Sequence, residues 1–343
     1  MLKELIRLPS FSREEDRTAA VIEHFFSSRN IPCTRVGNNV LALNREFDPA
    51  KPTLLLNSHH DTVRPNTGYA RDPFDPAVEN GKLYGLGSND AGGALVALIT
   101  CFIHFWPLSG LRYNIALAAT AEEEISGSGG VELALKKLPP IEAALVGEPT
   151  GMEMAIAERG LLVLDCVAKG VAGHAARGDG TNAIYAAMAD IEWLRNYSFE
   201  KISSLLGQVT ASVTVIGTGN RAHNVVPAEC TFVVDLRVNE LYEFEEILEI
   251  MRANMACELN PRSMRIRPTI IPAEHPLVQA GMAIGKKYFG SPTTSDKALM
   301  PFPALKMGPG DSRRSHTADE FIYVDEIGRG IEDYIALLNQ VVL

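Results

Sequence analysis

The chain has 343 residues, of which 46% are hydrophobic and 22% are charged, and its formal net charge is −10. This composition is typical of a globular protein with about two domains. An acidic chain without a run of lysines and arginines is not expected to bind nucleic acid or an anionic membrane surface.

The five cysteines are scattered along the chain and form no C-x-x-C pair. This predicts free thiols in a reducing compartment, and argues against disulfides or a thiolate zinc site. The first residues, MLKELIRLPSFSREED, lack the long apolar core of a signal peptide. The longest apolar stretch, residues 94–105, is shorter than a membrane-spanning helix. We therefore expect a cytoplasmic protein without a membrane segment.

The first part of the chain alternates predicted helices and strands. Hydrophobic residues recur at helical spacing in residues 13–29, and a second helix is predicted over residues 91–105. Short, uninterrupted apolar runs occur at residues 40–43, 53–56, 114–120 and 143–146. Such runs are typical of strands covered by helices on both faces, so we expect a three-layer α/β domain with a mostly parallel sheet.

The pattern changes after residue 160. Predicted strands and helices follow in the order β-α-β-β-α-β, at residues 161–170, 181–197, 211–219, 228–238, 241–260 and 263–271, which is the order of a ferredoxin-like α+β unit. The α/β pattern then returns, with a helix at residues 276–289, a strand at 303–308 and a helix at 324–338. The sequence thus predicts one domain of residues 1–160 and 269–343, interrupted by a smaller domain of residues 161–268.

Polar side chains follow most of the buried strands predicted for the first domain. They are His59 and Asp61, the triplet Glu122 to Glu124, Glu148, Asp90 at the start of a helix, and His316 after a glycine-rich loop. Because the carboxyl ends of parallel strands meet at one edge of a sheet, these side chains should lie close together. Crowded carboxylates require a cation or a proton, and this donor set suits zinc. The number of carboxylates exceeds what one ion needs, which predicts two ions roughly 3.5–4 Å apart.

Other site motifs fail on inspection. In GLGSND, Asp90 replaces the third glycine of a dinucleotide-binding G-x-G-x-x-G motif. The sequence contains no phosphate-binding G-x-x-x-x-G-K-[ST] loop and no G-x-S-x-G nucleophile elbow.

The motifs HHD, GLGSNDAGG, AEEEISG, GEPT, AGHAA and GPG…SH…DE together resemble the aminoacylase-like zinc metallopeptidases. That family includes acetylornithine deacetylase, succinyl-diaminopimelate desuccinylase and a bacterial glutamate carboxypeptidase. The match spans residues 59–320 in the family's order. The resemblance implies that the inserted domain is a dimerisation or lid domain and that the protein is a homodimer.

The resemblance also implies a role for individual residues. The ligands of two Zn²⁺ ions (or Co²⁺) would be His59, Asp90, Glu124, Glu148 and His316. Asp90 would bridge the ions and precede a cis peptide bond, Asp61 would orient His59, and Glu123 would be the general base. Glu122, where relatives usually have Asp, is expected to be structural. Independently of the resemblance, His60 points to the opposite side of its strand from His59 and Asp61, so it too is expected to be structural. The remaining implied site residues are His174, which would reach a neighbouring subunit's active site, and the substrate-binding Asn224, Arg237, Gly308 and Gly310.

We therefore expect a di-metal hydrolase of linear amides that deacylates an N-acyl-L-amino acid. The overall likeness to acetylornithine deacetylase favours N-acetyl-L-ornithine, as in arginine biosynthesis. Arg313 and Arg314, beside His316, would suit a dicarboxylic acyl group such as succinyl. The alternatives are a dipeptidase or carboxypeptidase, a succinyl-diaminopimelate desuccinylase, and a conjugate-binding protein without activity.

Overall fold

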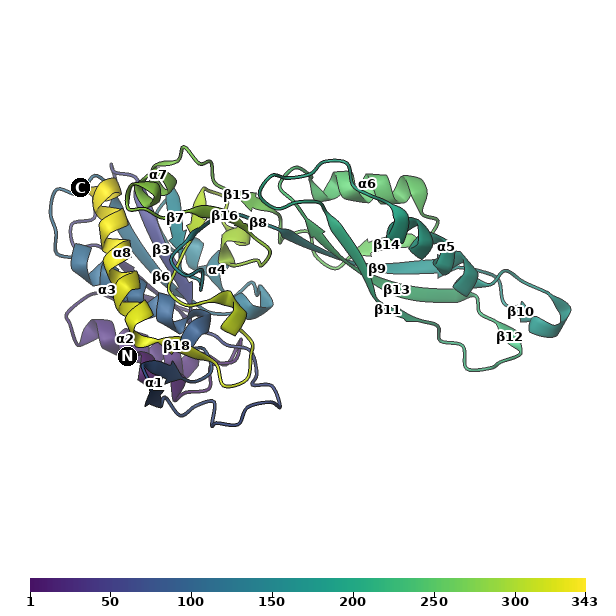
Figure 1. Ribbon diagram of the computed structural model, residues 1–343, viewed down its shortest axis with the longest axis horizontal. Coiled ribbons are helices and arrows are strands. Elements are labelled where there is room, and N and C mark those ends of the chain that lie inside the picture. Colours follow the sequence, from purple (N-terminus) through teal and green to yellow (C-terminus); the bar gives the residue numbers. More distant parts are fainter. The chain divides into compact units, whose positions relative to one another are not determined.

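A computed structural model describes residues 1–343, which fall into two compact units (Figure 1). The first unit comprises Met1–Ile156, Ile270–Phe289 and Ser295–Leu343. The second comprises Ala157–Thr269 and Gly290–Thr294. The role of the second unit as a dimerisation or lid domain stays a prediction.

A nine-stranded sheet forms the centre of the first unit, in the order β1-β2-β6-β3-β7-β17-β8-β15, with β16 beside β8. The four strands β6, β3, β7 and β17 are parallel to one another and buried along their whole length. This confirms the predicted α/β class with a mostly parallel sheet. The strands are β1 Cys33–Val36, β2 Asn39–Leu43, β3 Thr53–His59, β6 Asn114–Thr120, β7 Ala143–Val146, β8 Met154–Glu158, β15 Thr269–Ile270, β16 Tyr288–Ser291 and β17 Ala304–Lys306.

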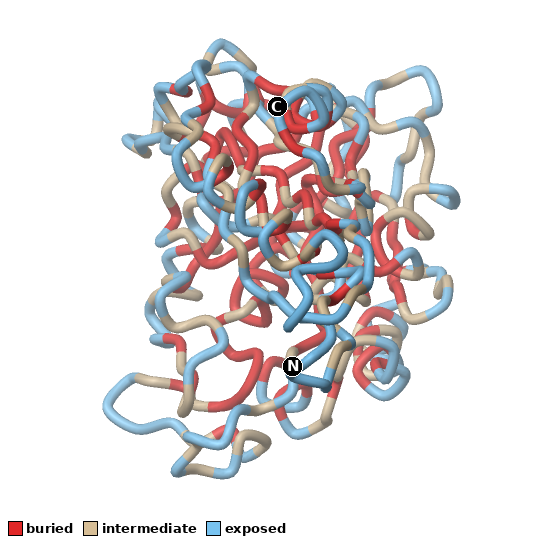
Figure 2. Tube along the Cα trace, turned by 90° about the vertical axis from the view of Figure 1, so that its right-hand side faces the viewer, coloured by how far each residue is buried: buried red, intermediate tan, exposed pale blue.

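Helices cover both faces of this sheet. Helix α3 packs on β3 and β6 and against α8, which also contacts α7. On the other face, Leu55, Ala116 and Ala144 pack against Val131 and Ala134 of α4. Figure 2 shows buried segments in the interior and exposed segments in the surrounding loops. The helices are α1 Leu2–Ile6, α2 Asp16–Ser27, α3 Gly93–Phe105, α4 Val131–Leu135, α7 Pro276–Ala283 and α8 Val324–Val342. A small separate sheet comprises β4 Val78–Glu79, β5 Lys82–Tyr84 and β18 Phe321–Tyr323.

The parallel strands end at one edge of the sheet. His59, the last residue of β3, is in register with Thr120, the last residue of β6. Val146, at the end of β7, is in register with Asn57 of β3 and with Lys306, at the end of β17. The loops that follow these four strands therefore begin side by side. In open α/β sheets, ligands bind at this edge, beyond the carboxyl ends of the strands.

The second unit has an antiparallel sheet in the order β11-β13-β9-β14. Buried residues alternate along β13, and they pack with apolar residues of α5 and α6 in one core. This is the ferredoxin-like arrangement predicted from the sequence. Its elements are β9 Gly160–Lys169, α5 Ala183–Asn196, β11 Thr210–Gly217, β13 Glu229–Val238, α6 Phe244–Asn254 and β14 Glu258–Pro261, with a small ribbon of β10 Gly173–His174 and β12 Val225–Val226.

Two element predictions were wrong in detail. The helix predicted over residues 241–260 ends at Asn254, because Met255 is extended. Residues 258–261 then form the fourth strand, β14, in place of residues 263–271. The helix predicted over residues 276–289 ends at Ala283, shortly before Gly285, whose φ is +84°. Residues 288–291 form β16 instead.

The segment Ser88–Phe105 is long and apolar enough to cross a membrane, but 72% of it is buried inside the protein. That burial is typical of a core helix, and it matches the packing of α3 between the sheet and α8.

Candidate metal centre

Asp90 lies between two histidines that are far apart in the sequence. His59 Nε2 is 3.3 Å from Asp90 Oδ1, and His316 Nε2 is 3.6 Å from Asp90 Oδ2. The two oxygens of one carboxylate thus face two different imidazoles, which is the arrangement of a carboxylate between two cations. The peptide bond from Asp90 to Ala91 is cis, as the family resemblance implied.

Further carboxylates converge on the same two imidazoles. Glu148 Oε1 is 3.7 Å from His59 Nε2, and Glu124 Oε2 is 2.9 Å from His316 Nε2. Glu123 Oε2 is 3.9 Å from His59 Nε2. Two groups of three residues each have candidate ligand atoms within 4.8 Å of one another. One group is His59, Asp90 and Glu124, and the other is His59, Glu123 and Glu148. The structure brings the five predicted ligands and Glu123 together, while the assignment of Glu123 as base and of the others as ligands stays a prediction.

Asp61 fixes the loop that follows β6 as well as His59. Its Oδ1 accepts the backbone N–H of Glu123 and lies 3.4 Å from His59 Nδ1. Its Oδ2 accepts the backbone N–H of Glu124 and the hydroxyl of Ser12, at 3.1 and 2.7 Å. Asp61 is fully buried. The sequence predicted its contact with His59 but not its contacts with the glutamate loop.

Glu320 holds the backbone around Asp90 by hydrogen bonds and was not predicted as a site residue. Its carboxylate accepts the backbone N–H groups of Gly87, Asn89 and Asp90 at 2.8 to 3.1 Å. The side chain of Asn89 in turn bonds to both backbone groups of Asp311, in the segment that leads to His316. The only sequence signal for Glu320 was its place at the end of the last family motif.

Asp296 is a second buried carboxyl that sequence analysis missed. It is 3% exposed, and its Oδ2 accepts the hydroxyl of Thr120 at 2.7 Å. Burial raises the pKa of Asp296 to about 6, and the negative charge of Asp61 adds to this effect. It adds another acidic group to the surroundings of Glu123. A single Asp in the segment TTSDKAL gives no spacing from which this place was predictable.

The electrostatics of the cluster fit a cationic occupant. Burial and the neighbouring charges of Glu148 and Asp296 raise the pKa of Glu123 well above its ordinary value. Burial lowers the pKa of His59, but the carboxylates around it outweigh this and raise it well above the usual range. The hydrogen bond with Glu124 raises the pKa of His316 to about 9. Without cations the cluster retains protons, whereas two divalent ions on these nitrogens and oxygens would replace them.

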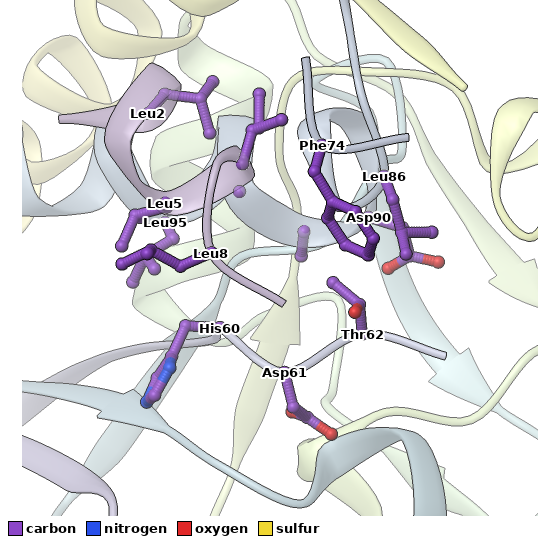
Figure 3. A pocket seen from close by; sticks show the side chains of 14 residues that line it. Leu2, Leu5, Leu8, His60, Asp61, Thr62, Phe74, Leu86, Asp90 and Leu95 are labelled. Atoms are coloured by element: carbon purple, nitrogen blue, oxygen red, sulfur yellow. The ribbon is translucent and has the colours of Figure 1, made fainter. Parts of the chain in front are cut away.

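A small cavity adjoins Asp61 and Asp90, with Leu2, Leu5 and Thr62 in its wall (Figure 3). Its volume of about 20 Å³ is roughly that of one water molecule. It is too small for a substrate, and it lies between α1 and the loops that carry the two aspartates.

The predicted lid residues lie in the second unit. His174, on β10, is exposed, and its Nδ1 accepts the backbone N–H of Ala176. The backbone oxygen of Asn224 accepts the N–H of Ala175 at 3.0 Å, so the ribbon of β10 and β12 brings His174 and Asn224 together. Arg237, on β13, forms a bidentate ion pair with Asp235. The active-site roles of these three residues stay predictions.

Gly308 and Gly310 have structural reasons to be glycine. A Cβ at Gly308 would lie 2.5 Å from the backbone oxygen of Glu148, and Gly310 has φ +97°. The N–H of Gly308 donates to the hydroxyl of Thr150, and its oxygen accepts the N–H of Thr150 and of Met152. Because both backbone groups of Gly308 already have partners, its substrate contact stays a prediction.

Comparison with known proteins extends these observations. The family described as peptidase family M20/M25/M40 matches residues 55–340. A succinyl-diaminopimelate desuccinylase of Cereibacter sphaeroides is 30% identical over 254 residues, which cover 70% of this chain and 67% of that protein. The protein of the same name from Dinoroseobacter shibae is 29% identical over 265 residues, covering 73% and 70% of the two chains.

Solved structures share the whole fold at low sequence identity. An M20 family metallo-carboxypeptidase from Sulfolobus solfataricus has a TM-score of 0.75 and 19% identity, and the match covers 99% of this chain and 98% of that chain. A dinuclear metal-binding peptidase of the M20 family from Bacillus subtilis has a TM-score of 0.73 and 18% identity, with 99% and 96% of the chains covered.

Proposed function

Because the chain belongs to peptidase family M20/M25/M40 and is therefore a metal-dependent amide hydrolase, we propose that it removes the acyl group from an N-acyl-L-amino acid. The amino acid in this proposal is L-ornithine, carrying an N-acetyl or N-succinyl group. The observation that carries the proposal is the position of Asp90, whose two carboxylate oxygens face His59 and His316.

The donor atoms support a pair of Zn²⁺ ions, with Co²⁺ as the alternative. His59 and Glu148 would hold one ion, His316 and Glu124 the other, and Asp90 both. Bound there, the ions would polarise the amide carbonyl and lower the pKa of water toward about 7.

In this proposal Glu123 moves the proton. Its side chain, 13% exposed, lies beside His59, and its backbone N–H is bonded to Asp61. Glu123 takes a proton from the attacking water and gives it to the nitrogen of the amine when the amide C–N bond breaks. His174 of a second copy stabilises the negative charge on the carbonyl oxygen, a contribution of about 2.7–4 kcal/mol in comparable sites.

The two arginines before His316 have different surroundings. Arg314 forms a bidentate ion pair with Glu326 and stacks over Phe321, which occupies its guanidinium. Arg313 is 88% exposed and pairs only with Asp311 at the surface. Surface ion pairs of this kind are weak, so a dicarboxylic acyl group competes readily for Arg313. We therefore assign a succinyl carboxylate to Arg313 and not to Arg314.

A panel of substrates tests the proposal. With the metal-reconstituted protein, kcat/KM is measured for N-acetyl-L-ornithine, N-succinyl-L-ornithine and N-succinyl-diaminopimelate. We expect an ornithine conjugate to be the best substrate. A clear preference for the diaminopimelate conjugate supports the second candidate, a desuccinylase, which the names of the two curated relatives favour.

The remaining alternatives have their own outcomes in the same panel. Faster cleavage of dipeptides than of acyl amino acids would indicate a peptidase, as the names of solved structures with this fold suggest. Binding of conjugates without turnover, after zinc or cobalt is added, would indicate a conjugate-binding protein.

A homodimer is part of the proposal, and the second unit supplies its surface. Strand β11 is at the edge of its sheet, with Val215 58% and Ile216 54% exposed. Helix α5 exposes Tyr185 and Met188 by 70% and 55%. An edge strand has unpaired backbone groups that a second β11 can bond, and the apolar side chains beside it favour burial.

The free cysteines support a cytoplasmic location.

The molar mass in solution tests this surface. Val215→Lys should shift the protein from dimer to monomer and lower kcat, since His174 acts across the dimer. Ile202→Lys changes an equally exposed residue outside α5 and β11 and should leave the dimer intact. A monomeric wild-type protein with full activity would contradict both the dimer and the role of His174.

A further inference from the structure

A buried carboxylate outside the metal centre is bonded to the loop that carries Glu123. Glu15 is fully buried. Its Oε1 accepts the backbone N–H of Arg13 at 2.6 Å and that of Glu122 at 3.2 Å. Its Oε2 accepts the side-chain N–H of Asn38 at 2.8 Å. Glu15 therefore connects the segment before α2, the turn after β1 and the loop after β6.

Three consecutive backbone amides of that loop point to buried carboxylates. The N–H of Glu122 donates to Glu15, and those of Glu123 and Glu124 donate to Asp61. Glu122 has the left-handed conformation, with φ 55° and ψ 20°. A non-glycine residue holds this conformation only where its surroundings fix it, at a cost of order 1–3 kcal/mol. The bond to Glu15 is one of the contacts that fix it.

The position of Glu15 in its own helix does not explain its side chain. Glu15 is the N-cap residue of α2, yet its side chain makes no capping hydrogen bond to that helix. The carboxylate turns instead toward Glu122 and Asn38. The same segment also reaches Asp61, through the hydroxyl of Ser12.

We propose that Glu15 is a positioning residue for catalysis, which sets the direction of the Glu123 carboxyl by holding the N–H of Glu122. Glu15 touches no metal ligand and no reacting atom, so it acts only through the backbone of the loop. The inference rests on the proposed role of Glu123 as general base. A displacement of about 1 Å in a proton-transferring group lowers the rate by up to about 100-fold.

Two substitutions of Glu15 and one matched control test the proposal. Glu15→Ala removes every acceptor for the N–H of Glu122. Glu15→Gln keeps one acceptor but places an amide NH₂ near a donor. Glu14→Ala is the control, because Glu14 is exposed and forms only a surface ion pair with Arg64.

We expect Glu15→Ala to lower kcat about 10- to 100-fold, with KM within about twofold of wild type and two metal ions still bound at saturation. Glu15→Gln should fall between this variant and wild type, and Glu14→Ala should match wild type. If kcat in Glu15→Ala changes no more than in Glu14→Ala, or falls only in proportion to the folded fraction, the proposal is refuted.

Hydrogen–deuterium exchange supplies a measurement that needs neither substrate nor metal. In the wild-type protein the amide of Glu122 should exchange slowly, and in Glu15→Ala at least about tenfold faster, while amides of the central strands keep their protection. Unchanged exchange at Glu122 would overturn the inference even if activity fell. If the wild-type protein hydrolyses none of the conjugates, the proposed function fails, and exchange alone decides the role of Glu15 in holding the loop.

Discussion

Replacing Asp61 by asparagine removes a negative charge from the metal centre without changing the size of the side chain. The carboxylate accepts the N–H groups of Glu123 and Glu124, one on each oxygen, and the hydroxyl of Ser12 on the second. In asparagine one oxygen becomes an NH₂ group. In either orientation that NH₂ faces one of the two backbone N–H groups, which then has no acceptor.

The cost of this substitution follows from the lost acceptor. A buried donor without a partner costs about 1–3 kcal/mol. In the metal-free protein the loop can relieve this cost by moving, which displaces Glu124. Metal binding requires Glu124 in its original place, so it brings back the unfavourable contact and loses that free energy. At about 1.4 kcal/mol per tenfold change, the affinity for the metal should fall roughly 5- to 150-fold. Loss of the anion beside His59 acts in the same direction.

A competition titration against a chelating dye measures this affinity for wild type, Asp61→Asn and Ser12→Ala. Ser12→Ala removes one hydroxyl donor and leaves the carboxylate in place, so its affinity should stay within about threefold of wild type. If Asp61→Asn also stays within threefold, the loop does not depend on Asp61 as the hydrogen bonds indicate.

Three further predictions concern the same unit. Glu123→Gln should retain two metal ions by elemental analysis and lose about 10²- to 10⁴-fold in kcat; loss of metal would show that Glu123 is a ligand. Without metal, the unfolding free energy should fall between pH 4.5 and about 8 in urea titrations. Burial raises the pKa of Glu320 from 4.5 to about 8, so the folded state binds the proton that the unfolded state has released; a rise over that window would contradict this. Gly308→Ala should lower the unfolding free energy by about 1–3 kcal/mol, because its Cβ would lie 2.5 Å from the backbone oxygen of Glu148. Gly328→Ala, at an open position in α8, is the control and should not lower the unfolding free energy. Equal effects of the two substitutions would refute the steric argument.

The parts of the structure that the sequence predicted well are those with a repeating pattern. The apolar runs at residues 114–120 and 143–146 coincide with β6 and β7, because a strand buried on both faces allows no polar interruption. Glu123, Glu124 and Glu148 follow these two strands, so their proximity also followed from the pattern. The fourth strand of the second unit was misplaced because β14 is a short edge strand that contains Pro261, and its pairing with β9 depends on tertiary contacts.

The contacts that hold the loops around the centre left no such signal. Glu15, Asp61 and Glu320 accept hydrogen bonds mainly from backbone N–H groups. Every residue other than proline supplies a backbone donor, so the partner of a buried acceptor has no characteristic residue type. The sequence therefore predicted which side chains gather at the centre, but not the hydrogen bonds by which buried carboxylates hold the loops that carry them.

The place of β17 in the sheet has a consequence for the newly made chain. β17 lies between β7 and β8, and it reaches the sheet only from residues 304–306. Until that segment leaves the ribosome, β7 has an open hydrogen-bonding edge and His316 is missing from the cluster. The second unit, almost all of it within residues 157–269, has its complete sheet by then. The later of the two units to be finished is therefore the one that carries the candidate metal centre. A nascent chain stalled before residue 304 exposes an apolar strand edge that can pair with other chains.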